Sequence, residues 1–457
     1  MPKHIFREYD IRGLAEKELT DETSRAIGRA FGAFLAKKKG AKGRAGARVG
    51  VAYDLRPSSV RIHQALVEGL TQAGSDVFDL GLVPTPLLYY GVVHFQLDAG
   101  ISITGSHNPP QYNGFKFQLK DRPFYGEDIQ GLREAIEGET AKIRAAKSGK
   151  VERADPIEPY LAELKQQFKY SKKWKIVIDC GHAMAGLVAP KLFKELGQDV
   201  IELYTHLDPK FPDHHPDPSV LENLEDLSNE VRRQNAHLGI AFDGDADRIG
   251  VVDEKGNPFL GDRLLTIFAR QVLKKQKGAA VVADVKCSPL LYRDIEKRGG
   301  RPILWKTGHS LIKAKMKEER AALGGEMSGH MFFADRWYGF DDAIYAACRM
   351  VEILDEEKRP VSELLADLPE VVSTPEIRIE VSDDRKKFEI VEKAVAELKT
   401  RYKVIDLDGA RLEFEDGFGL IRASNTQPVL VMRFEATSQK RLDEIRSLIE
   451  ETLQKYA

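Results

Sequence analysis

Three aspartates alternate with small residues in the segment HLGIAFDGDADRIGVVDE, at Asp243, Asp245 and Asp247. The apolar runs 238–242 and 249–252 on either side predict two strands, which fix both ends of the acidic link. Carboxylates about 4 Å apart repel by about 4 kcal/mol per pair at an effective dielectric constant of 20, so such a cluster either spreads into water or holds a cation. Oxygen ligands of this kind suit Mg²⁺ or Mn²⁺. We therefore predict a metal site here in preference to a solvated acidic turn.

Three other binding motifs are excluded by one or two positions each. A calcium EF-hand loop that started at Asp243 would need glycine at its sixth position, where this chain has Arg248. The glycine-rich segment CGHAMAG is followed by Leu187 and Val188, which stand where a P-loop needs lysine and then serine or threonine. Ala183 takes the place of the second glycine of a dinucleotide-binding motif. We interpret this segment as a turn between a strand and a helix, and expect no nucleotide cofactor.

The segment ISITGSHNPPQYNGFKFQLK, residues 101–120, begins as an apolar strand and then breaks into a polar loop. Ser106, His107 and Asn108 follow the strand and precede two prolines. Glycine, serine, asparagine and proline are ordinary turn residues, so by itself the segment indicates a tight turn. A serine at the carboxyl end of a strand is nevertheless where open α/β sheets usually place their chemistry. Ser106 is therefore a candidate whose role depends on partners elsewhere in the chain.

A second polar loop lies near the carboxyl end, in the segment LIRASNTQPVLVMRFEAT. It places Arg422, Ser424, Asn425 and Thr426 between two predicted strands. A guanidinium fork, two hydroxyls, an amide and free backbone N–H groups are what a phosphate dianion requires. A polar hairpin loop without a ligand explains the segment equally well.

A third polar pattern lies in GGEMSGHMFF, residues 324–333. Glu326, Ser328 and His330 occupy alternate positions, so in an extended segment they would point to one face. A carboxylate, a hydroxyl and an imidazole on one face suit sugar hydroxyls. Half-buried strands also carry such residues without any function.

Composition limits the class of protein. The chain has 457 residues, which suggests about three domains, and its 69 basic residues nearly balance its 71 acidic ones. We therefore expect no nucleic acid and no anionic membrane as partner. We see no signal peptide or membrane span, and three separated cysteines, at positions 180, 287 and 348, indicate neither disulfides nor zinc. A cytoplasmic protein is expected.

Short β-branched runs alternate with helix-length amphipathic segments, which predicts an α/β fold with largely parallel sheets. Three apolar strands end in aspartate before a helix, at Asp54, Asp179 and Asp284, as three related α/β units would. Changes of composition divide the chain into four expected domains, the last of which is a smaller α+β unit. The expected bounds are residues 1–150, 151–254, 255–368 and 369–457.

Six motifs occur together in a fixed order: YDIRG at 9–13, TGSHNP at 104–109, FPDHHPDP at 211–218, DGDADR at 243–248, GEMSGH at 325–330 and RASNTQP at 422–428. In identity, order and spacing they resemble the α-D-phosphohexomutase family, most closely its bacterial phosphomannomutase/phosphoglucomutase branch. The resemblance extends from residue 5 to 437. It implies three topologically similar α/β domains and a smaller C-terminal α+β domain around a central cleft.

The resemblance also implies roles for residues of this chain. Ser106 would carry a phosphoryl group and, as phosphoserine, complete the Mg²⁺ site of Asp243, Asp245 and Asp247. Lys116 would take the proton of the attacking sugar hydroxyl, for which nearby positive charge must lower its pKa. The other expected catalytic residues are His107, Arg248 and His330. The expected substrate-binding residues are Arg12, Lys286, His309, Glu326, Ser328, Arg422, Ser424, Asn425 and Thr426.

The implied reaction interconverts hexose 1-phosphate and hexose 6-phosphate, of mannose or glucose, through phosphoserine and a hexose 1,6-bisphosphate intermediate. The expected partners are therefore small hexose phosphates. A phosphoglucosamine mutase is the first alternative, although Met327 resembles the mannose/glucose branch, where the glucosamine branch tends to have Gln. A Mg²⁺-dependent sugar phosphatase and a sugar-phosphate binding protein are the others. Ala246 departs from the family, which often has glycine there, and a methyl group is tolerated unless the backbone needs a positive φ.

Overall fold

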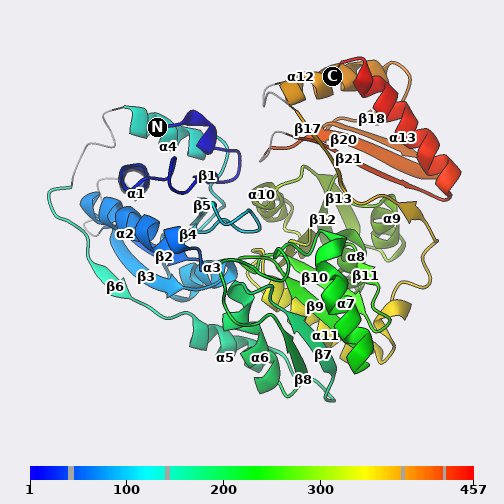
Figure 1. Cartoon of the computed structure of the whole chain (residues 1–457), viewed down its shortest axis with the longest axis horizontal. Helices are drawn as coiled ribbons and strands as arrows, with labels where there is room; N and C mark the ends of the chain where they lie inside the picture. The colour runs from blue at the N-terminus through cyan, green and yellow to red at the C-terminus, as the bar shows by residue number, and fades with distance from the viewer. Residues whose placement is uncertain (40–45, 139–144, 382–385, 426–428, 457) are drawn as a thin grey trace. The chain divides into compact units, whose positions relative to one another are not determined.

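The computed structural model describes residues 1–39, 46–138, 145–381, 386–425 and 429–456 (Figure 1). The chain divides into two compact units. Unit 1 consists of residues 1–260 and 328–362, and unit 2 of residues 261–327 and 363–457.

The first sheet of unit 1 has the strand order β1-β5-β4-β2-β3-β6. Strands β4, β2, β3 and β6 run parallel, and β5 is antiparallel to both β4 and β1. Its strands are β1 (Ile11–Leu14), β2 (Arg48–Tyr53), β3 (Asp76–Leu82), β4 (Ala99–Ile103), β5 (Tyr112–Leu119) and β6 (Val151–Arg153). The helices of this part of the chain are α1 (Asp21–Lys39), α2 (Pro57–Gln72), α3 (Thr85–His94) and α4 (Glu127–Glu137).

Helices cover both faces of this sheet, as the alternation of side chains along β2 shows. Val49 and Val51 belong to one hydrophobic cluster with Leu66 of α2. A Cβ at Gly50 would instead meet Leu88 of α3, on the opposite face. Strand β4 is buried over its whole length. The serine loop therefore leaves the end of a central, covered strand.

The second sheet of unit 1 has the order β11-β10-β9-β7-β8. The predicted strands around the three aspartates are β9 and β10, an antiparallel pair in which Phe242 lies opposite Ile249. The strands are β7 (Lys175–Asp179), β8 (Asp199–Leu203), β9 (Leu238–Phe242), β10 (Ile249–Asp253) and β11 (Pro258–Phe259). Unit 1 also contains α5 (Ile157–Gln167), α6 (Ala189–Glu195), α7 (Glu225–Gln234), β15 (Met331–Phe333) and α11 (Ala343–Glu357).

Unit 2 contains a parallel sheet and an antiparallel sheet. In the parallel sheet, β12 (Ala280–Asp284) lies between β13 (Arg301–Trp305) and β14 (Leu323–Gly325). The helices of this part of the chain are α8 (Gly261–Lys275), α9 (Pro289–Lys297) and α10 (His309–Glu319). The antiparallel sheet consists of β16 (Val372–Ser373), β17 (Ile377–Glu380), β18 (Val404–Ile405), β19 (Ala410–Phe414), β20 (Gly417–Ala423) and β21 (Val429–Ala436).

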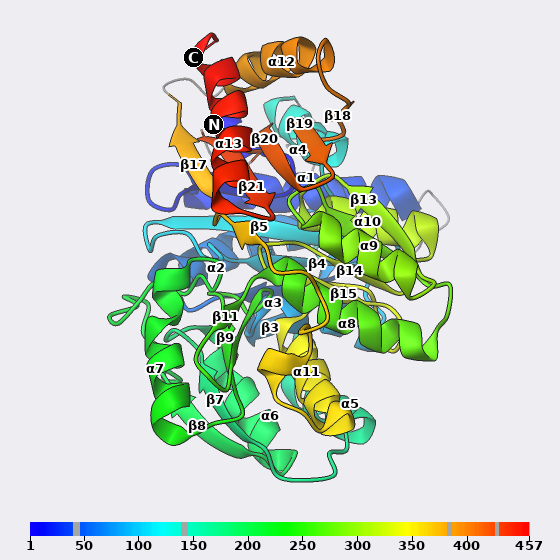
Figure 2. The ribbon, with the colours of Figure 1, turned by 90° about the vertical axis from the view of Figure 1, so that its right-hand side faces the viewer.

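Helices α12 (Lys386–Lys399) and α13 (Gln439–Gln454) pack on the antiparallel sheet (Figure 2). Ile390 of α12 and Ile445 of α13 share one hydrophobic cluster with Ile421, Met432 and Phe434 of the strands. The carboxyl end of the chain is therefore an α+β unit, as the sequence predicts. Together with the mixed sheets of the rest of the chain, it confirms a multi-domain α/β fold.

Three sheets share one strand order, in which the middle strand comes first in the chain. The three sets are β3-β2-β4, β8-β7-β9 and β13-β12-β14. The repeated aspartates follow or end the middle strand of each set, at Asp54, Asp179 and Asp284. The sequence echo therefore marks the same position in three related sheets.

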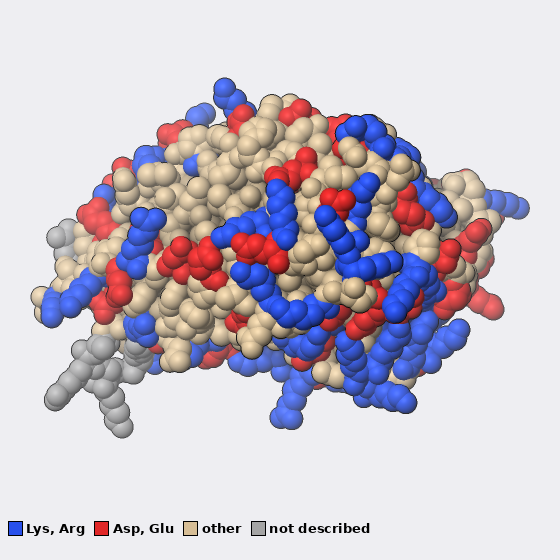
Figure 3. All heavy atoms as spheres, turned by 90° about the horizontal axis from the view of Figure 1, so that it is seen from below, with Lys and Arg blue, Asp and Glu red and all other residues tan. Residues whose placement is uncertain are grey.

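Acidic side chains lie among lysine and arginine side chains on the face drawn in Figure 3, as expected for a chain with nearly equal numbers of both. Within the described ranges, no helix has the length and apolar character needed to cross a membrane.

Candidate active site

The three aspartates of the β9–β10 link converge in unit 1. Asp243, Asp245 and Asp247 are buried, and one carboxylate oxygen of each lies within 4.8 Å of the others. Burial, together with the charges of the other two aspartates, raises the pKa of Asp243 well above its ordinary value. Asp245 Oδ1 is buried without a hydrogen-bond partner in the described part of the chain. A divalent cation fits this set of oxygens, and these three residues would hold it.

Ser106 meets this cluster from the first sheet of the same unit. Its Oγ donates to Asp243 Oδ2 at 3.1 Å and lies 3.2 Å from His107 Nδ1. The Ser106 backbone has φ +49°, in the left-handed region. A side chain at Gly244 would collide with the Ser106 carbonyl oxygen, so glycine is required there for the two loops to meet.

Ala246 has φ +62°. The backbone at this position therefore needs a positive φ, at which the methyl group of alanine is unfavourable. Alanine in the left-handed region costs about 1 kcal/mol more than glycine. This position of the metal loop is therefore strained in this chain.

Lys116 of β5 completes what we call the serine–aspartate cluster: Ser106, Lys116, Asp243, Asp245 and Asp247. Its Nζ lies 2.7 Å from Asp245 Oδ2 and 2.5 Å from Asp247 Oδ2. Burial alone would lower the pKa of Lys116, but the carboxylates outweigh it and raise the pKa above its usual range. The positive neighbours expected from the sequence are thus replaced by negative ones, and in this structure Lys116 is an ammonium counter-ion.

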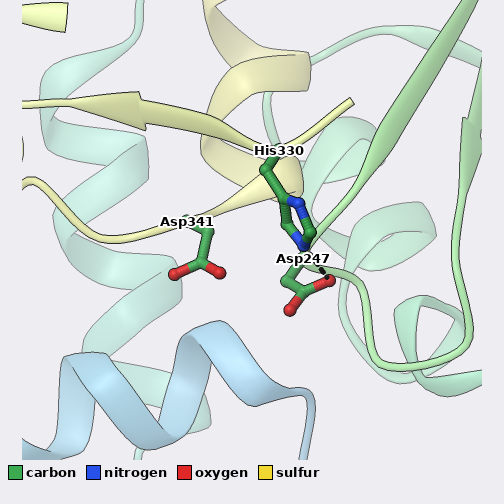
Figure 4. A group of neighbouring side chains, drawn as sticks. All are labelled: Asp247, His330 and Asp341. Atoms are coloured by element: carbon green, nitrogen blue, oxygen red, sulfur yellow. Dashed lines mark ion pairs between the residues drawn. The ribbon is translucent and has the colours of Figure 1, made fainter. Parts of the chain in front are cut away.

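His330 borders the cluster (Figure 4). Its Nε2 lies 3.2 Å from Asp247 Oδ1 and accepts from Arg248 Nε at 3.4 Å. Its Nδ1 lies 3.3 Å from the Ser328 hydroxyl. Asp341 also lies near, because one oxygen of Asp341 and of Asp247 and a His330 nitrogen fall within 4.8 Å of one another. Arg248 and His330 therefore meet beside the three clustered aspartates.

The prediction of one extended segment over residues 324–333 is wrong for the middle of that segment. Strand β14 ends at Gly325 and β15 begins at Met331, and residues 327–329 form a turn in which Gly329 has φ +96°. Glu326 Oε1 accepts from the Gly308 N–H at 2.6 Å. The alternation of polar residues is therefore no guide to a shared face here, because a turn breaks the period of two.

Arg12 of β1 is buried, and its Nη2 donates to Asp10 Oδ2 at 2.5 Å. Both residues belong to the YDIRG motif. A carboxylate thus already pairs with this candidate phosphate-binding cation.

Two further cations are paired in the same way in unit 2, and we call the two pairs the paired-cation cluster. Lys286 Nζ lies 3.0 Å from Glu376 Oε2 and 3.7 Å from Asp284 Oδ2. Arg422 Nε donates to Asp408 Oδ2 at 2.9 Å. Burial alone would lower the pKa of Lys286, but the charges of Glu376 and Asp284 raise it. Each buried cation of this cluster therefore has its own carboxylate.

Thr307 connects the two pairs. Its N–H donates to Asp408 Oδ2 at 3.0 Å and its hydroxyl to Asp284 Oδ2 at 3.1 Å. His309, the first residue of α10, is buried two positions further on. In the second polar loop the Ser424 N–H donates to the Val429 carbonyl at 3.0 Å, whereas Thr426 lies outside the described residues.

Models of one family match almost the whole chain. They are the phosphoglucomutase/phosphomannomutase alpha/beta/alpha domains I, II and III, over residues 3–143, 158–256 and 260–372, and the C-terminal domain over residues 376–452. The chain belongs to the phosphoglucomutase/phosphomannomutase family.

Relatives in this family are similar over their full length. The chain is 45% identical to a phosphomannomutase/phosphoglucomutase of Pseudomonas aeruginosa, over 99% of this chain and 96% of that protein. It is 44% identical to a phosphoglucomutase of Neisseria gonorrhoeae, over 97% and 95%. A crystal structure of a phosphoglucomutase/phosphomannomutase family protein from Burkholderia thailandensis superposes with a TM-score of 0.91, at 42% identity, over 100% and 98% of the two chains.

Sequence reasoning missed the residues that hold these side chains in place. Glu376 and Asp408 are single carboxylates in segments without a motif, and Arg56 follows a strand in the segment YDLRPSS. His215 of the FPDHHPDP motif donates to the His107 carbonyl. The one sequence signal beside Arg56 is Asp54, the repeated aspartate that follows β2.

Proposed function

We propose that this family member interconverts hexose 1-phosphate and hexose 6-phosphate through a phosphoryl group carried on Ser106. The enzyme is a phosphomannomutase/phosphoglucomutase, an isomerase, and mannose and glucose phosphates are the proposed substrates. The observation that carries the proposal is the Ser106 Oγ, which lies 3.1 Å from a carboxylate of a buried cluster of three aspartates.

The first half of the reaction transfers the phosphoryl group from serine to sugar. The bond between phosphorus and the Ser106 Oγ breaks, a bond forms to the free O1 or O6 of the hexose monophosphate, and the hydroxyl proton leaves for a base. The product is a hexose 1,6-bisphosphate. In the second half the bond between phosphorus and the other sugar oxygen breaks, that oxygen takes the proton back from the base, and the phosphoryl group forms a bond to the Ser106 Oγ. The enzyme thus regains its phosphoserine, and the sugar leaves as the isomeric monophosphate.

Phosphoserine carries nearly two negative charges at neutral pH, so transfer depends on neutralising charge. Mg²⁺, when held by Asp243, Asp245 and Asp247, supplies positive charge to the phosphate oxygens. Arg248 and Arg12 are proposed to add to this charge. Ser106, when phosphorylated, would join the three aspartates in holding the ion.

Lys116 is proposed to exchange the hydroxyl proton. Its side chain is an ammonium in the structure, held by Asp245 and Asp247. Lys116 can therefore act as a base only after this ammonium has lost a proton. His107 and His330 are proposed to orient the groups that react, since they contact Ser106 and Asp247.

The phosphate that does not react is proposed to bind Arg422, Ser424, Asn425 and Thr426. Lys286, His309, Glu326 and Ser328 are proposed to contact the sugar or its phosphate. We also propose that the chain divides into four domains, residues 1–150, 151–254, 255–368 and 369–457, and that the site residues are distributed among them.

A coupled assay tests the function and its alternatives. The enzyme is mixed with Mg²⁺, catalytic hexose 1,6-bisphosphate and mannose, glucose or glucosamine 1-phosphate in turn. We expect 6-phosphate product from mannose and glucose 1-phosphates. A marked preference for glucosamine 1-phosphate would indicate a phosphoglucosamine mutase, and release of inorganic phosphate without isomer would indicate a phosphatase.

A further inference from the structure

One buried arginine makes four hydrogen bonds to backbone carbonyls of the serine loop and the start of β5. Arg56 is 1% exposed, and its guanidinium uses all five of its N–H donors. Nη2 donates to the carbonyls of Ser106 at 2.9 Å and Asn108 at 2.5 Å. Nη1 donates to the carbonyls of Pro109 at 2.6 Å and Tyr112 at 3.0 Å. The fifth donor, Nε, pairs with a carboxylate.

That carboxylate is Asp54, which also contacts the loop directly. Asp54 Oδ2 accepts from Arg56 Nε at 3.1 Å and from the Gly105 N–H at 3.0 Å. Its other oxygen accepts from the Arg56 N–H at 3.0 Å and the Ser59 hydroxyl at 2.5 Å. Asp54 therefore accepts from the N–H of the residue before Ser106, and Arg56 donates to the carbonyls of Ser106 and of residues after it.

Of these four carbonyls, that of Pro109 also accepts from the Tyr112 N–H at 3.0 Å. Pro109 and Pro110 have no N–H to offer, and buried carbonyls without partners are rare in proteins. Ser106 is held at φ +49°, a conformation that persists only where surrounding contacts determine it. A Cβ at Gly105 would overlap the Arg56 guanidinium, so the glycine before the serine is explained by the close approach of this arginine.

We propose that Arg56 is a positioning residue for the phosphoryl-carrying serine. Its guanidinium fixes the backbone of residues 106–112 so that the Ser106 Oγ stays beside Asp243. The inference rests on the proposed phosphoserine mechanism and adds a residue that touches neither substrate nor metal. Because a displacement of about 1 Å in a reacting group can lower a rate about a hundredfold, the fork of Arg56 acts on the rate of transfer.

Arg56→Lys is the first test, since lysine keeps the charge but offers three donors from a single nitrogen and cannot reach four carbonyls. We expect kcat to fall about a hundredfold and KM for hexose phosphate to change less than about threefold. Rapid mixing of phosphorylated enzyme with hexose monophosphate should show loss of phosphate from Ser106 slowed by the same factor. In Arg56→Ala, added methylguanidinium should restore part of kcat.

Arg349→Lys is the matched control. Arg349 of α11 is also fully buried in unit 1 and pairs with Asp335 at 2.8 and 2.9 Å. It should lower the melting temperature as much as Arg56→Lys and leave kcat unchanged. Equal losses of kcat in both variants would mean that Arg56 acts only through stability, which would overturn the inference.

Two further outcomes are decisive. If Arg56→Lys folds and keeps kcat within about threefold of the wild type, the inference is wrong. If Arg56→Lys does not fold, Gly105→Ala is tested in its place, because its methyl group would overlap the Arg56 guanidinium. A normal kcat in Gly105→Ala would likewise show that the inference is wrong. Wild-type enzyme that turns over without phosphate on Ser106 would remove the proposed mechanism and this inference together. A phosphorylated wild type with unaffected Arg56 variants would remove the inference alone.

Discussion

The serine–aspartate cluster of unit 1 and the paired-cation cluster of unit 2 are both buried and both charged, but their charges are balanced differently. In the first, three aspartates share one lysine, and an oxygen of Asp245 has no hydrogen-bond partner among the described residues. In the second, Lys286 and Arg422 each have a carboxylate partner. Buried charge without a counter-charge is unfavourable. An excess of carboxylates therefore attracts a cation, whereas neutral pairs can exchange a carboxylate for a substrate phosphate.

The comparison predicts that changes to the first cluster abolish the chemistry and that changes to the second alter binding. The largest effect is expected for Ser106→Ala, because removing a nucleophile typically lowers kcat by about four orders of magnitude or more. Intact-mass analysis should show a phosphate on part of the wild-type molecules and on none of the variant. Ser438→Ala, which removes the N-cap of α13, is the control and should keep its activity. Normal turnover by Ser106→Ala would contradict the covalent mechanism.

Removal of the metal ranks second. Chelation, or Asp245→Asn, should lower activity about a thousandfold, since a bound cation provides several kcal/mol of charge stabilisation. Titration calorimetry supplies a readout apart from activity: Mg²⁺ should bind to the wild type and not to Asp245→Asn. Added Mg²⁺ should also raise the melting temperature of the wild type alone. Exhaustively chelated enzyme with full activity would assign the three aspartates a structural role.

Arg422→Ala should have an intermediate effect. Loss of an arginine–phosphate contact typically lowers kcat/KM about ten- to a hundredfold. Because the proposed phosphate contact would serve every substrate, the loss should be equal for mannose and glucose phosphates and for both directions, leaving their ranking unchanged. Arg441→Ala, which removes a half-buried arginine of α13 that pairs with Asp416, is the control. A loss confined to one sugar would show that this loop contacts the sugar itself.

The smallest effect is expected for Glu376→Gln. If Lys286 binds a substrate phosphate as proposed, that phosphate competes with the Glu376 carboxylate, which lies 3.0 Å from the Lys286 ammonium. A neutral amide competes less, so KM for hexose phosphate should fall about two- to fivefold with kcat nearly unchanged. Glu413→Gln, which removes the carboxylate partner of Arg411, should leave KM unchanged. A rise in KM for Glu376→Gln would mean that the carboxylate positions Lys286 and does not compete with substrate.

Much of the fold could be predicted because it rests on local pattern. The strands on both sides of Asp243–Asp247 follow from two apolar runs, and their antiparallel pairing follows from the short link between them. The repeated aspartates indicated three related sheets. The extended reading of residues 324–333 failed, because alternation of polar residues cannot reveal a turn at Gly329 that tertiary contacts impose.

The sequence by itself determined which residue types could do chemistry: an acidic link between two strands, a serine after a strand, and a polar loop with an arginine. Each is encoded within about ten neighbouring residues, so spacing reveals it. Only the tertiary structure decided how these groups are charged and held. Lys116 lies between Asp245 and Asp247, about 130 positions away, which turns an expected base into a counter-ion. Arg56 reaches carbonyls some fifty positions along the chain. A single arginine or lysine has no spacing signal, because its meaning depends on burial and on partners that only folding brings within hydrogen-bond distance.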